Sequence, residues 1–347
     1  MGDELAPEGS HPGAAPPLAV SVIVPTRNRR RLLQEVIGAL WAQTVPPDRF
    51  EIIVVDNCST DGTPELMAEL IARSPCRLVY QVMPENRGPA RSRNTGARLA
   101  RGEILAFTDD DCRPTPEWLA SGLAGFRAGV GLVTGRVLYK PEQIAGAGFF
   151  SRDTGLVLEE HPTYTWSNSL YRRDPFLELD GTDETLCRPD LLDRVVDCGD
   201  TDLAWRVKKR GWANVFAPEA LVYHELQQMT PLRWLLEPLR LFVLPQLVQR
   251  HPELRRHLLH GRVFFLRESA WFYLAALSVP LASLWHWGLL ALAAPYLAWC
   301  LRFLRRSLTN PAGWPKIPLQ AALLAARQAV LCAALVYGSI RFRTLVL

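Results

Sequence analysis

Short, unbroken apolar segments alternate with longer amphipathic ones in the first third of the chain. Four apolar segments have the length and composition of buried strands: 20–24, 51–55, 78–82 and 104–107. Between them, apolar residues recur at helical spacing, which predicts helices at 30–42, 63–73 and 89–99. Unbroken apolar strands separated by helices are typical of a parallel sheet that is covered on both faces. The sequence therefore predicts an α/β fold with a mostly parallel sheet and helices on both faces.

Polar clusters follow three of these four strands, at the point where each strand ends. Residues 25–28 follow the first strand, 56–59 the second, and Asp109-Asp110-Asp111 the fourth. The carboxyl ends of parallel strands meet at one edge of a sheet, where open α/β folds bind their ligands. Adjacent carboxylates repel one another unless a cation or solvent relieves them, and their oxygens suit Mg²⁺ or Mn²⁺. The alternative is an acidic, solvated loop or a helix cap before Pro114.

No phosphate-binding glycine loop accompanies these clusters. The first strand is not followed by G-x-G-x-x-G, and G-x-x-x-x-G-K-[ST] is missing from the chain. A diphosphate would therefore be held by a metal and by scattered cations, for which Arg27, Arg87, Arg91 and Arg93 are candidates. A solvated surface position is the alternative for each of these arginines.

Five sequence blocks, in order, resemble the family 2 glycosyltransferases. The blocks are VSVIVPTRN (20–28), IVVDNCSTDGT (53–63), ENRGPARSRNTG (85–96), RGEILAFTDDD (101–111) and DTDLAWRV (200–207). The last block is similar to the family's E-D-x-D-L-x-x-R segment, and the resemblance covers about residues 18–225. It implies a GT-A fold and an inverting transfer of a sugar from a nucleotide donor to a hydroxyl group. It also implies a divalent cofactor, Mn²⁺ or Mg²⁺.

The resemblance further implies roles for the residues at the strand ends. Eight residues would bind the nucleotide sugar: Pro25, Thr26, Arg27, Asn28, Asp56, Asn57, Arg87 and Arg93. Asp109 and Asp111 would bind the metal that bridges the donor diphosphate, and Asp110 would either reach the ribose or share the metal. His224 follows an apolar segment and would complete the metal or diphosphate site. A purely structural histidine is the alternative there.

Asp200 is the predicted catalytic base, because a poorly nucleophilic hydroxyl needs a carboxylate to take its proton. It begins a predicted helix at 200–210, so a capping role for Asp200 or Asp202 is the alternative. The chain has Gly199 where the family usually has glutamate, which leaves the acceptor contacts of that glutamate open. Four residues are assigned to the acceptor side, with ordinary turn structure as the alternative: Trp166, Asn168, Asp183 and Asp202.

Composition narrows the class of protein. A net charge of +4 without a basic patch before residue 230 does not predict a nucleic-acid partner. Seven cysteines without framework spacing indicate reduced thiols in the cytosol. Residues 1–17 are rich in Pro, Gly and Ala and have no apolar core, which predicts a disordered tail rather than a signal peptide.

The C-terminal third predicts contact with a membrane. No Asp, Glu, Lys or Arg occurs at 269–301, and a helix needs about 20 apolar residues to cross a bilayer. This segment can form one long tilted helix or a hairpin turning near His286, with a buried helical pair in a soluble domain as the alternative. Arginines flank both ends, which favours a hairpin with both ends in the cytosol: Arg262, Arg267, Arg302, Arg305 and Arg306. Residues 318–340 are a weaker candidate, because Arg327 would cost about 2.5–3.5 kcal/mol in a spanning helix.

Four regions are therefore expected: a tail at 1–17, a GT-A domain at 18–230, amphipathic interfacial helices at 231–268 and membrane-associated helices at 269–347. The expected function is transfer of a sugar to a lipid-linked or polysaccharide precursor, by a catalytic domain in the cytoplasm at the cell membrane. A processive polysaccharide synthase is a first alternative, although Thr230 stands at the glutamine position of its Q-x-x-R-W motif before Arg233. A nucleotidyltransferase and a catalytically inactive membrane scaffold are the others.

Overall fold

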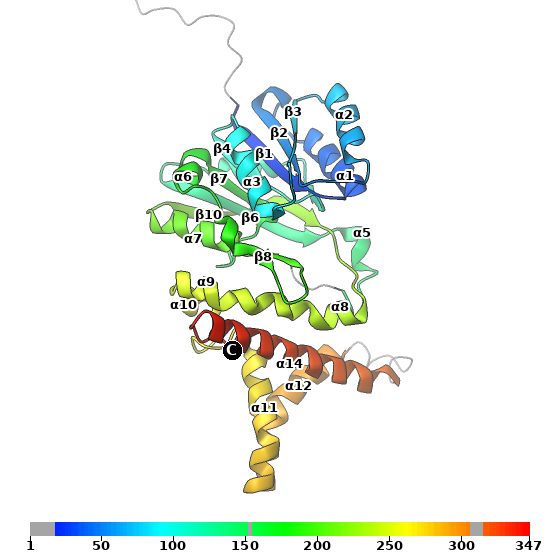
Figure 1. Cartoon of the computed structure of the whole chain (residues 1–347), viewed down its shortest axis with the longest axis vertical. Coiled ribbons are helices and arrows are strands. Elements are labelled where there is room, and N and C mark those ends of the chain that lie inside the picture. The colour runs from blue at the N-terminus through cyan, green and yellow to red at the C-terminus, as the bar shows by residue number, and fades with distance from the viewer. Residues whose placement is uncertain (1–17, 152–154, 306–314) are drawn as a thin grey trace, which may run out of the picture.

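The computed structural model describes residues 18–151, 155–305 and 315–347, so the tail expected at 1–17 lies outside the described residues. An eight-stranded sheet forms the centre of the molecule, and the C-terminal helices form a layer below it (Figure 1). The strands are β1 (Val20–Thr26), β2 (Phe50–Asp56), β3 (Arg77–Val82), β4 (Ile104–Phe107), β5 (Cys112–Pro114), β6 (Val130–Tyr139), β7 (Ser169–Arg172) and β10 (Ala213–His224). A separate two-stranded sheet pairs β8 (Cys187–Pro189) with β9 (Val195–Asp197).

The sheet is mixed, with the strand order β3-β2-β1-β4-β7-β6-β10-β5. The four strands predicted from the sequence are parallel to one another, as expected. In the other half of the sheet β7 runs antiparallel to both β4 and β6, and β5 runs antiparallel to β10. Strands β6 and β10 run in the same direction as β1–β4, so the predicted mostly parallel sheet is confirmed, with β5 and β7 as its antiparallel strands.

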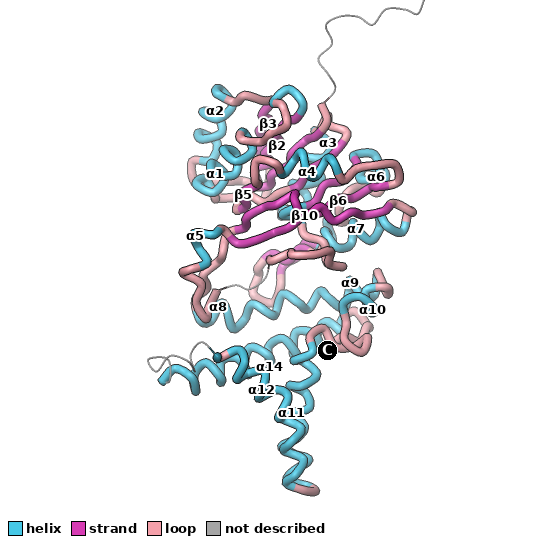
Figure 2. Tube along the Cα trace, turned by 180° about the vertical axis from the view of Figure 1, so that it is seen from behind, coloured by secondary structure: helices cyan, strands magenta, loops and turns pink. Residues whose placement is uncertain are grey.

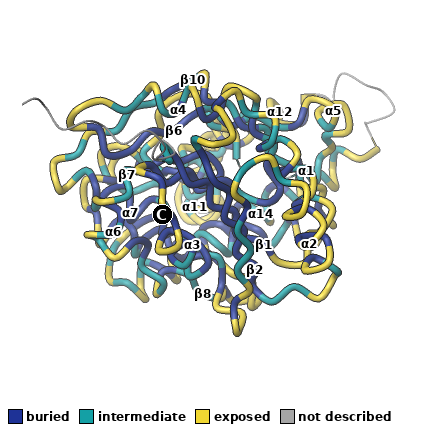
Figure 3. Tube along the Cα trace, turned by 90° about the horizontal axis from the view of Figure 1, so that it is seen from above, coloured by how far each residue is buried: buried dark blue, intermediate teal, exposed yellow. Residues whose placement is uncertain are grey.

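Helices cover both faces of the sheet, as the apolar strands predicted. They are α1 (Arg30–Trp41), α2 (Thr63–Arg73), α3 (Gly88–Leu99), α4 (Trp118–Ala124), α5 (Pro141–Ile144), α6 (Arg173–Glu178) and α7 (Gly199–Lys209). Along β1, Val22 and Val24 pack into the core that contains α1, α2 and α4, whereas Ile23 packs into the core that contains α3, α6 and α7. Buried backbone accordingly runs through the middle of the sheet when the molecule is viewed from above (Figure 3).

Four C-terminal helices share the second of these cores with the sheet: η4 (Glu237–Val243), α9 (Leu244–Arg250), α10 (Leu254–Leu258) and α14 (Ile317–Arg341). Trp234 of α8 (Pro231–Leu236) packs instead in a smaller cluster with Leu324 of α14. Leu247 of α9 and Leu335 of α14 belong to the same apolar cluster as Ile23 of β1. Helix α14 approaches η4 closely at Gly338, where an added Cβ would lie 2.1 Å from the carbonyl oxygen of Phe242. The helices at 231–250 are thus fixed beneath the sheet (Figure 2).

The charge-free segment forms a hairpin, one of the two arrangements that the sequence left open. Helix α11 (Arg267–Leu284) projects away from the domain, and η5 (Trp287–Ala293) and α12 (Ala294–Phe303) return beside it (Figure 1). Trp285 and Trp287 flank the turn with 80% and 77% of their surfaces exposed.

Among the described residues, α14 is the one helix long and apolar enough to cross a bilayer. This differs from the sequence analysis, which gave this segment less weight because of Arg327. In the structure, Arg327 lies over the ring of Trp234, 4.4 Å from its centroid, and donates to the Trp234 carbonyl oxygen. A core helix passes the same test of length and composition, and α14 packs against η4 and α9.

Candidate active site

A cavity of about 550 Å³ opens where β1, β2, β4 and β10 end. Eleven of the residues predicted from the sequence line it: Pro25, Thr26, Arg27, Asn57, Arg93, Asp109, Asp110, Asp111, Trp166, Asp200 and His224. The chain therefore brings the base, the acidic run and most of the nucleotide-binding candidates to one place. These residues come from seven separate segments of the chain, so it is the tertiary structure that brings them together.

The three adjacent aspartates have different partners. Asp110 accepts hydrogen bonds from Thr26 Oγ1 (2.8 Å) and Arg29 Nη1 (2.8 Å), and Arg29 Nη1 also donates to Asp111 (2.7 Å). Burial raises the pKa of Asp110 to about 6, although the charge of Arg29 opposes the rise. Arg29 thus relieves the repulsion in the acidic run. The sequence analysis did not single out Arg29, although it directly follows the TRN segment.

Asp109, Asp111 and His224 form a group that can hold a divalent metal. Their ligand atoms, with Cys112 Sγ, all lie within 4.8 Å of one another, and His224 Nε2 is 3.4 Å from Asp111 Oδ1. The other ring nitrogen, Nδ1, donates to the Glu225 carbonyl oxygen (2.8 Å), which orients the ring with Nε2 facing Asp111. Burial raises the pKa of Cys112 far above its ordinary value, so it stays a thiol. Two carboxylates and one imidazole suit Mn²⁺.

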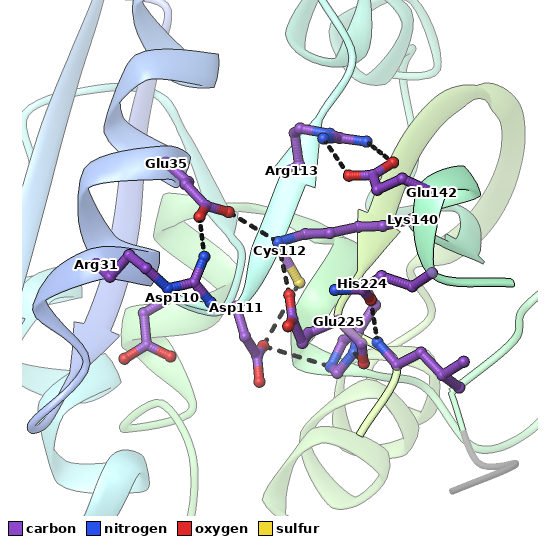
Figure 4. A network of polar contacts seen from close by, with 12 residues as sticks. Arg31, Glu35, Asp110, Asp111, Cys112, Arg113, Lys140, Glu142, His224 and Glu225 are labelled. Atoms are coloured by element: carbon purple, nitrogen blue, oxygen red, sulfur yellow. Dashed lines mark hydrogen bonds and ion pairs between the residues drawn. The ribbon is translucent and has the colours of Figure 1, made fainter. Parts of the chain in front are cut away.

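A buried lysine holds this group in place (Figure 4). Lys140 Nζ donates to Glu35 of α1 (3.0 Å) and to Glu225 (2.8 Å). The backbone adds two bonds, from Lys140 N to the His224 carbonyl (3.1 Å) and from Glu225 N to the Asp111 carbonyl (3.0 Å). Helix α1, the end of β6 and the end of β10 are therefore tied together beside Asp111 and His224.

Arg93 connects the acidic run to the segment of the predicted base. Its guanidinium donates to Asp109 Oδ1 (2.7 Å) and Asp197 Oδ2 (3.0 Å) and lies 4.9 Å from the centroid of the Trp166 ring. Only 6% of the side chain is exposed. Arg93 is thus a buried cation between two carboxylates of the cavity rather than a surface arginine. Asp197 was missed by the sequence analysis, since its strand β9 is only three residues long.

Asp200 lies in the first turn of α7 and faces the cavity. Protein surrounds the Asp200 carboxylate, although part of the residue is open to the cavity. Burial raises the pKa of Asp200 to about 7, and the negative charge of Asp197 adds to the rise. Cys198 occupies the N-cap position of the helix without a side-chain capping bond, and neither Asp200 nor Asp202 occupies that position. A carboxylate with a pKa near neutrality in a cleft is suited to general base catalysis.

The structure explains why glycine stands at 199. An added Cβ would lie 2.0 Å from the side-chain oxygen of Thr182 and 3.0 Å from Asp197 Oδ1, so a glutamate cannot occupy this position without rearrangement. The backbone nitrogen of Gly199 donates instead to Asp197 Oδ1 (2.8 Å). A carboxylate is therefore present beside residue 199, but it belongs to Asp197.

Three of the predicted nucleotide-binding residues do not line the cavity. Asn28 and Asp56 hold the loop after β2, because Asn28 Oδ1 accepts from Thr60 N (2.7 Å) and Asp56 Oδ1 from Ser59 N (2.8 Å). Arg87 pairs with Glu85 on the surface. These residues surround the cavity, and their contacts in this structure are with the protein itself.

Three of the four acceptor-side predictions also lie elsewhere; only Trp166 lines the cavity. Asn168 is buried and bonds to the carbonyls of Arg136 (2.9 Å) and Ala220 (2.7 Å), which joins β6 to β10. Asp183 lines a second cavity of about 560 Å³ and pairs with Arg250 (2.7 Å). The sequence could not distinguish these structural positions from acceptor contacts.

Asp202 connects the helix of the predicted base to the C-terminal layer. Its carboxylate is fully buried and accepts from Arg206 (2.8 Å), Arg250 (3.0 Å) and His251 (2.9 Å). Burial alone would raise the pKa of Asp202, but the bond from His251 and the charge of Arg206 lower it below its ordinary value. Asp202 therefore fixes α7 against α9 rather than facing the cavity.

Comparison with known proteins agrees with this geometry. Residues 21–180 match the family model described as Glycosyl transferase family 2. The glycosyltransferase AglE of Haloferax volcanii is 30% identical over 207 residues, which cover 59% of this chain and 66% of the relative. The poly(ribitol-phosphate) beta-N-acetylglucosaminyltransferase TarS of Staphylococcus aureus is 38% identical over 92 residues, 26% of this chain and 16% of the relative. The chain thus spans less than two thirds of the length of these relatives.

Solved structures agree with the fold. The mannosyltransferase PcManGT from Pyrobaculum calidifontis, in complex with GDP-Man and Mn²⁺, superposes with a TM-score of 0.56 at 22% identity, over 94% of this chain and 90% of that one. TarS 1-349 in complex with UDP superposes with a TM-score of 0.51 at 19% identity, over 93% and 91%. The fold and the acidic cavity define a GT-A-type protein. Residues 21–180 of the chain form a glycosyl transferase family 2 domain.

Proposed function

We propose that this protein is a metal-dependent, inverting glycosyltransferase that uses a nucleotide-sugar donor. The observation that carries the proposal is the placement of Asp200 in the same cavity as Asp109, Asp111 and His224. A base and a metal-binding group in one cavity are what an in-line displacement at a sugar's anomeric carbon requires. The structures of relatives that contain GDP-Man with Mn²⁺, or UDP, support a nucleotide-sugar donor and a divalent metal.

Each group has a chemical task in this reaction. Asp200 takes the proton of the acceptor hydroxyl, whose oxygen bonds to the anomeric carbon on the face opposite the leaving group. The bond from that carbon to the diphosphate oxygen breaks, and the configuration inverts. Asp109, Asp111 and His224 would hold the metal, which neutralises charge on the departing nucleoside diphosphate. Thr26 and Asn57 lie where the nucleoside would be bound, and Arg93 keeps Asp109 in position.

The alternatives fit the site less well. A nucleotidyltransferase would leave Asp200 without a task. In that reaction the attacking group is the ionised oxygen of a sugar phosphate, which needs no base, rather than a hydroxyl. A processive synthase is disfavoured because Arg233, in its R-W dipeptide, is exposed and does not line the cavity. An inactive scaffold would not be expected to retain Asp200, with its raised pKa, in the same cavity as Asp109 and Asp111.

We expect metal-dependent nucleotide binding in a thermal-shift measurement of the full chain in detergent. Ligands are UDP, GDP, CDP and dTDP, each with and without Mn²⁺. One of them should stabilise the chain only with Mn²⁺, by about 2.7 kcal/mol at a ligand concentration of 100 Kd. Asp111→Ala should abolish this shift, whereas Asp48→Ala, on an exposed turn away from the cavity, should retain it. A folded wild-type chain that responds to none of the nucleotides would contradict the proposal.

We also propose that the enzyme acts at the cytosolic face of the cell membrane, on a lipid-linked or polysaccharide precursor. The support is the hairpin of α11, η5 and α12, which carries no charged side chain between Ser269 and Leu301 and has arginines at its base. Its projecting turn exposes two tryptophans. The S. aureus relative is named for a poly(ribitol-phosphate) acceptor, which supports a polymeric acceptor as one possibility.

Replacing the two exposed tryptophans at the turn should weaken membrane binding. In flotation with phosphatidylglycerol–phosphatidylcholine vesicles, Trp285→Ser/Trp287→Ser should lower the partition coefficient by about 100-fold or more, since each of the two buried side chains contributes about 1.5–3 kcal/mol. The matched control is Ile71→Ser, which removes an exposed apolar side chain from α2, distant from the hairpin. Equal partition of all three proteins would show that the hairpin does not enter the bilayer.

A further inference from the structure

One residue of the C-terminal layer reaches the candidate active site. Among the described residues that line the cavity, Arg240 of η4 is the one from beyond residue 230. Its side chain is 28% exposed, whereas its partner Glu237 is only 8% exposed and accepts from Arg240 Nη1 at 2.8 Å. An arginine has five N–H donors in a planar fork, so a guanidinium held by one carboxylate can still bind an anion.

Contacts with the β8–β9 hairpin hold Arg240 in this position. Arg194, in the loop before β9, donates to Glu237 (3.1 Å) and to the Leu236 carbonyl (3.0 Å). A second carboxylate, Asp190, pairs with Arg194 (2.6 Å) and keeps it in place. Glu237 is therefore shared by two arginines from different elements. Because these contacts exist before any ligand binds, little ordering of Arg240 is needed on binding.

Arg240 is tied through Glu237 and Arg194 to the segment that leads into the predicted base. Strand β9, which follows Arg194, contributes Val195 and Asp197 to the cavity wall and leads into Asp200. The nucleoside candidates Thr26 and Asn57 come from the ends of β1 and β2 instead. In an inverting displacement the acceptor enters on the side of the base, opposite the leaving diphosphate. A cation on this side is placed to meet the acceptor.

Exposed apolar side chains occur in the cavity wall, in the hairpin that holds Arg240 and in the neighbouring helix α8. Val195 is 48% exposed in the cavity wall, Leu191 and Leu192 of the same hairpin are 57% and 45% exposed, and Leu232 of α8 is 65% exposed. Exposed apolar side chains on the elements that carry and hold a cavity arginine match an amphiphilic molecule with an anionic group. The guanidinium fork matches phosphate oxygens in particular.

We propose that Arg240 binds the phosphate group of a lipid-linked acceptor and so brings the acceptor hydroxyl to Asp200. This inference rests on the proposed glycosyltransfer and adds the chemical class of the acceptor. It also gives the C-terminal layer a direct part in the active site: η4 contributes a binding residue, and the helices around it fix that residue.

The test compares farnesyl phosphate, farnesol, inorganic phosphate and phosphatidylglycerol as ligands of the full chain in neutral detergent, with tryptophan fluorescence as the readout. Farnesyl phosphate should bind more tightly than the other three. Arg240→Gln should raise its Kd about 10- to 100-fold, the loss expected for a charge-assisted hydrogen bond, and Arg240→Lys should recover part of the affinity. Arg233→Gln, which removes an exposed arginine of the neighbouring helix α8, should leave the Kd unchanged.

The outcomes separate this inference from the proposed function. Mn²⁺-dependent binding of the nucleoside diphosphate should be unchanged in Arg240→Gln; an equal loss of both ligands would place Arg240 at the donor and overturn the inference. Equal Kd values for farnesyl phosphate in wild type and Arg240→Gln would also overturn it, and so would equal binding of phosphatidylglycerol, which would indicate a general headgroup contact. A wild-type chain that binds farnesyl phosphate but no nucleotide would instead contradict the proposed function.

Discussion

Asp200→Asn should lower the rate of sugar transfer by about 10²- to 10⁴-fold while leaving the affinity for the nucleoside diphosphate unchanged. The amide has the size of the carboxyl group but cannot take the acceptor proton. The backbone bond from Thr201 N to Asp200 Oδ1 (2.7 Å) is kept by the amide oxygen, so the fold of α7 should survive. Asp193→Asn, an exposed change in the β8–β9 loop, is the matched control and should keep full activity.

The pH dependence gives this prediction a second signature. Burial and the charge of Asp197 favour the neutral carboxyl, so the pKa of Asp200 is raised to about 7 and the active, ionised base is present above that pH. Below it, kcat/KM should fall about tenfold per pH unit in the wild type. Full activity of the folded Asp200→Asn enzyme, or a pH profile that is flat from 5 to 8, would remove Asp200 from the mechanism.

Arg93→Met should destabilise the chain by about 3–5 kcal/mol, because it leaves the carboxylates of Asp109 and Asp197 in the cavity without their shared cation. Urea unfolding monitored by circular dichroism measures this. Added Mn²⁺ should restore part of the lost stability, since a metal on Asp109 replaces some of the missing positive charge.

The matched control is two residues away on the same helix. Arg91 is 38% exposed and lies 3.6 Å from Glu184, so Arg91→Met should cost less than about 1 kcal/mol. Similar small losses for both variants would mean that Arg93 does not act as the bridge between Asp109 and Asp197.

Local patterns in the sequence predicted the N-terminal half of the fold, in which strands and helices alternate. The strand at 104–107 has the predicted bounds, and the acidic run follows it at the cavity. Strands β5 and β7 were not predicted, because they have three and four residues and depend on pairing with β10, β4 and β6. Shortness alone does not account for this, since β4 also has four residues. Strand β4 was predicted because it stands in the regular alternation of strands and helices, which β5 and β7 do not.

The candidate site shows the same division. Asp200 and the aspartates at 109–111 stand in recognisable blocks, whereas Arg240 reaches the cavity through packing of η4 beneath the sheet. Asp202 is two residues from the base, yet the helix turns its carboxylate toward Arg250 and His251. Proximity in sequence therefore gave the wrong neighbourhood for a residue whose partners are about 50 positions away.

The C-terminal region was predicted in composition rather than in arrangement. The apolar segments at 269–301 and 318–340 are helical, as expected. The sequence could not show that α14 packs along η4, since that contact depends on the close approach at Gly338 and on the stacking of Arg327 over Trp234.

We propose that sugar is transferred from a nucleotide donor with inversion of configuration. This proposal is tested most directly by following the donor to its products, with the full chain, Mn²⁺, the nucleotide sugar selected by thermal shift and a lipid extract of the source membranes. We predict one nucleoside diphosphate released for each sugar transferred, with the new glycosidic bond of opposite anomeric configuration to the donor. Release of pyrophosphate, or a product that retains the donor's configuration, would contradict the account.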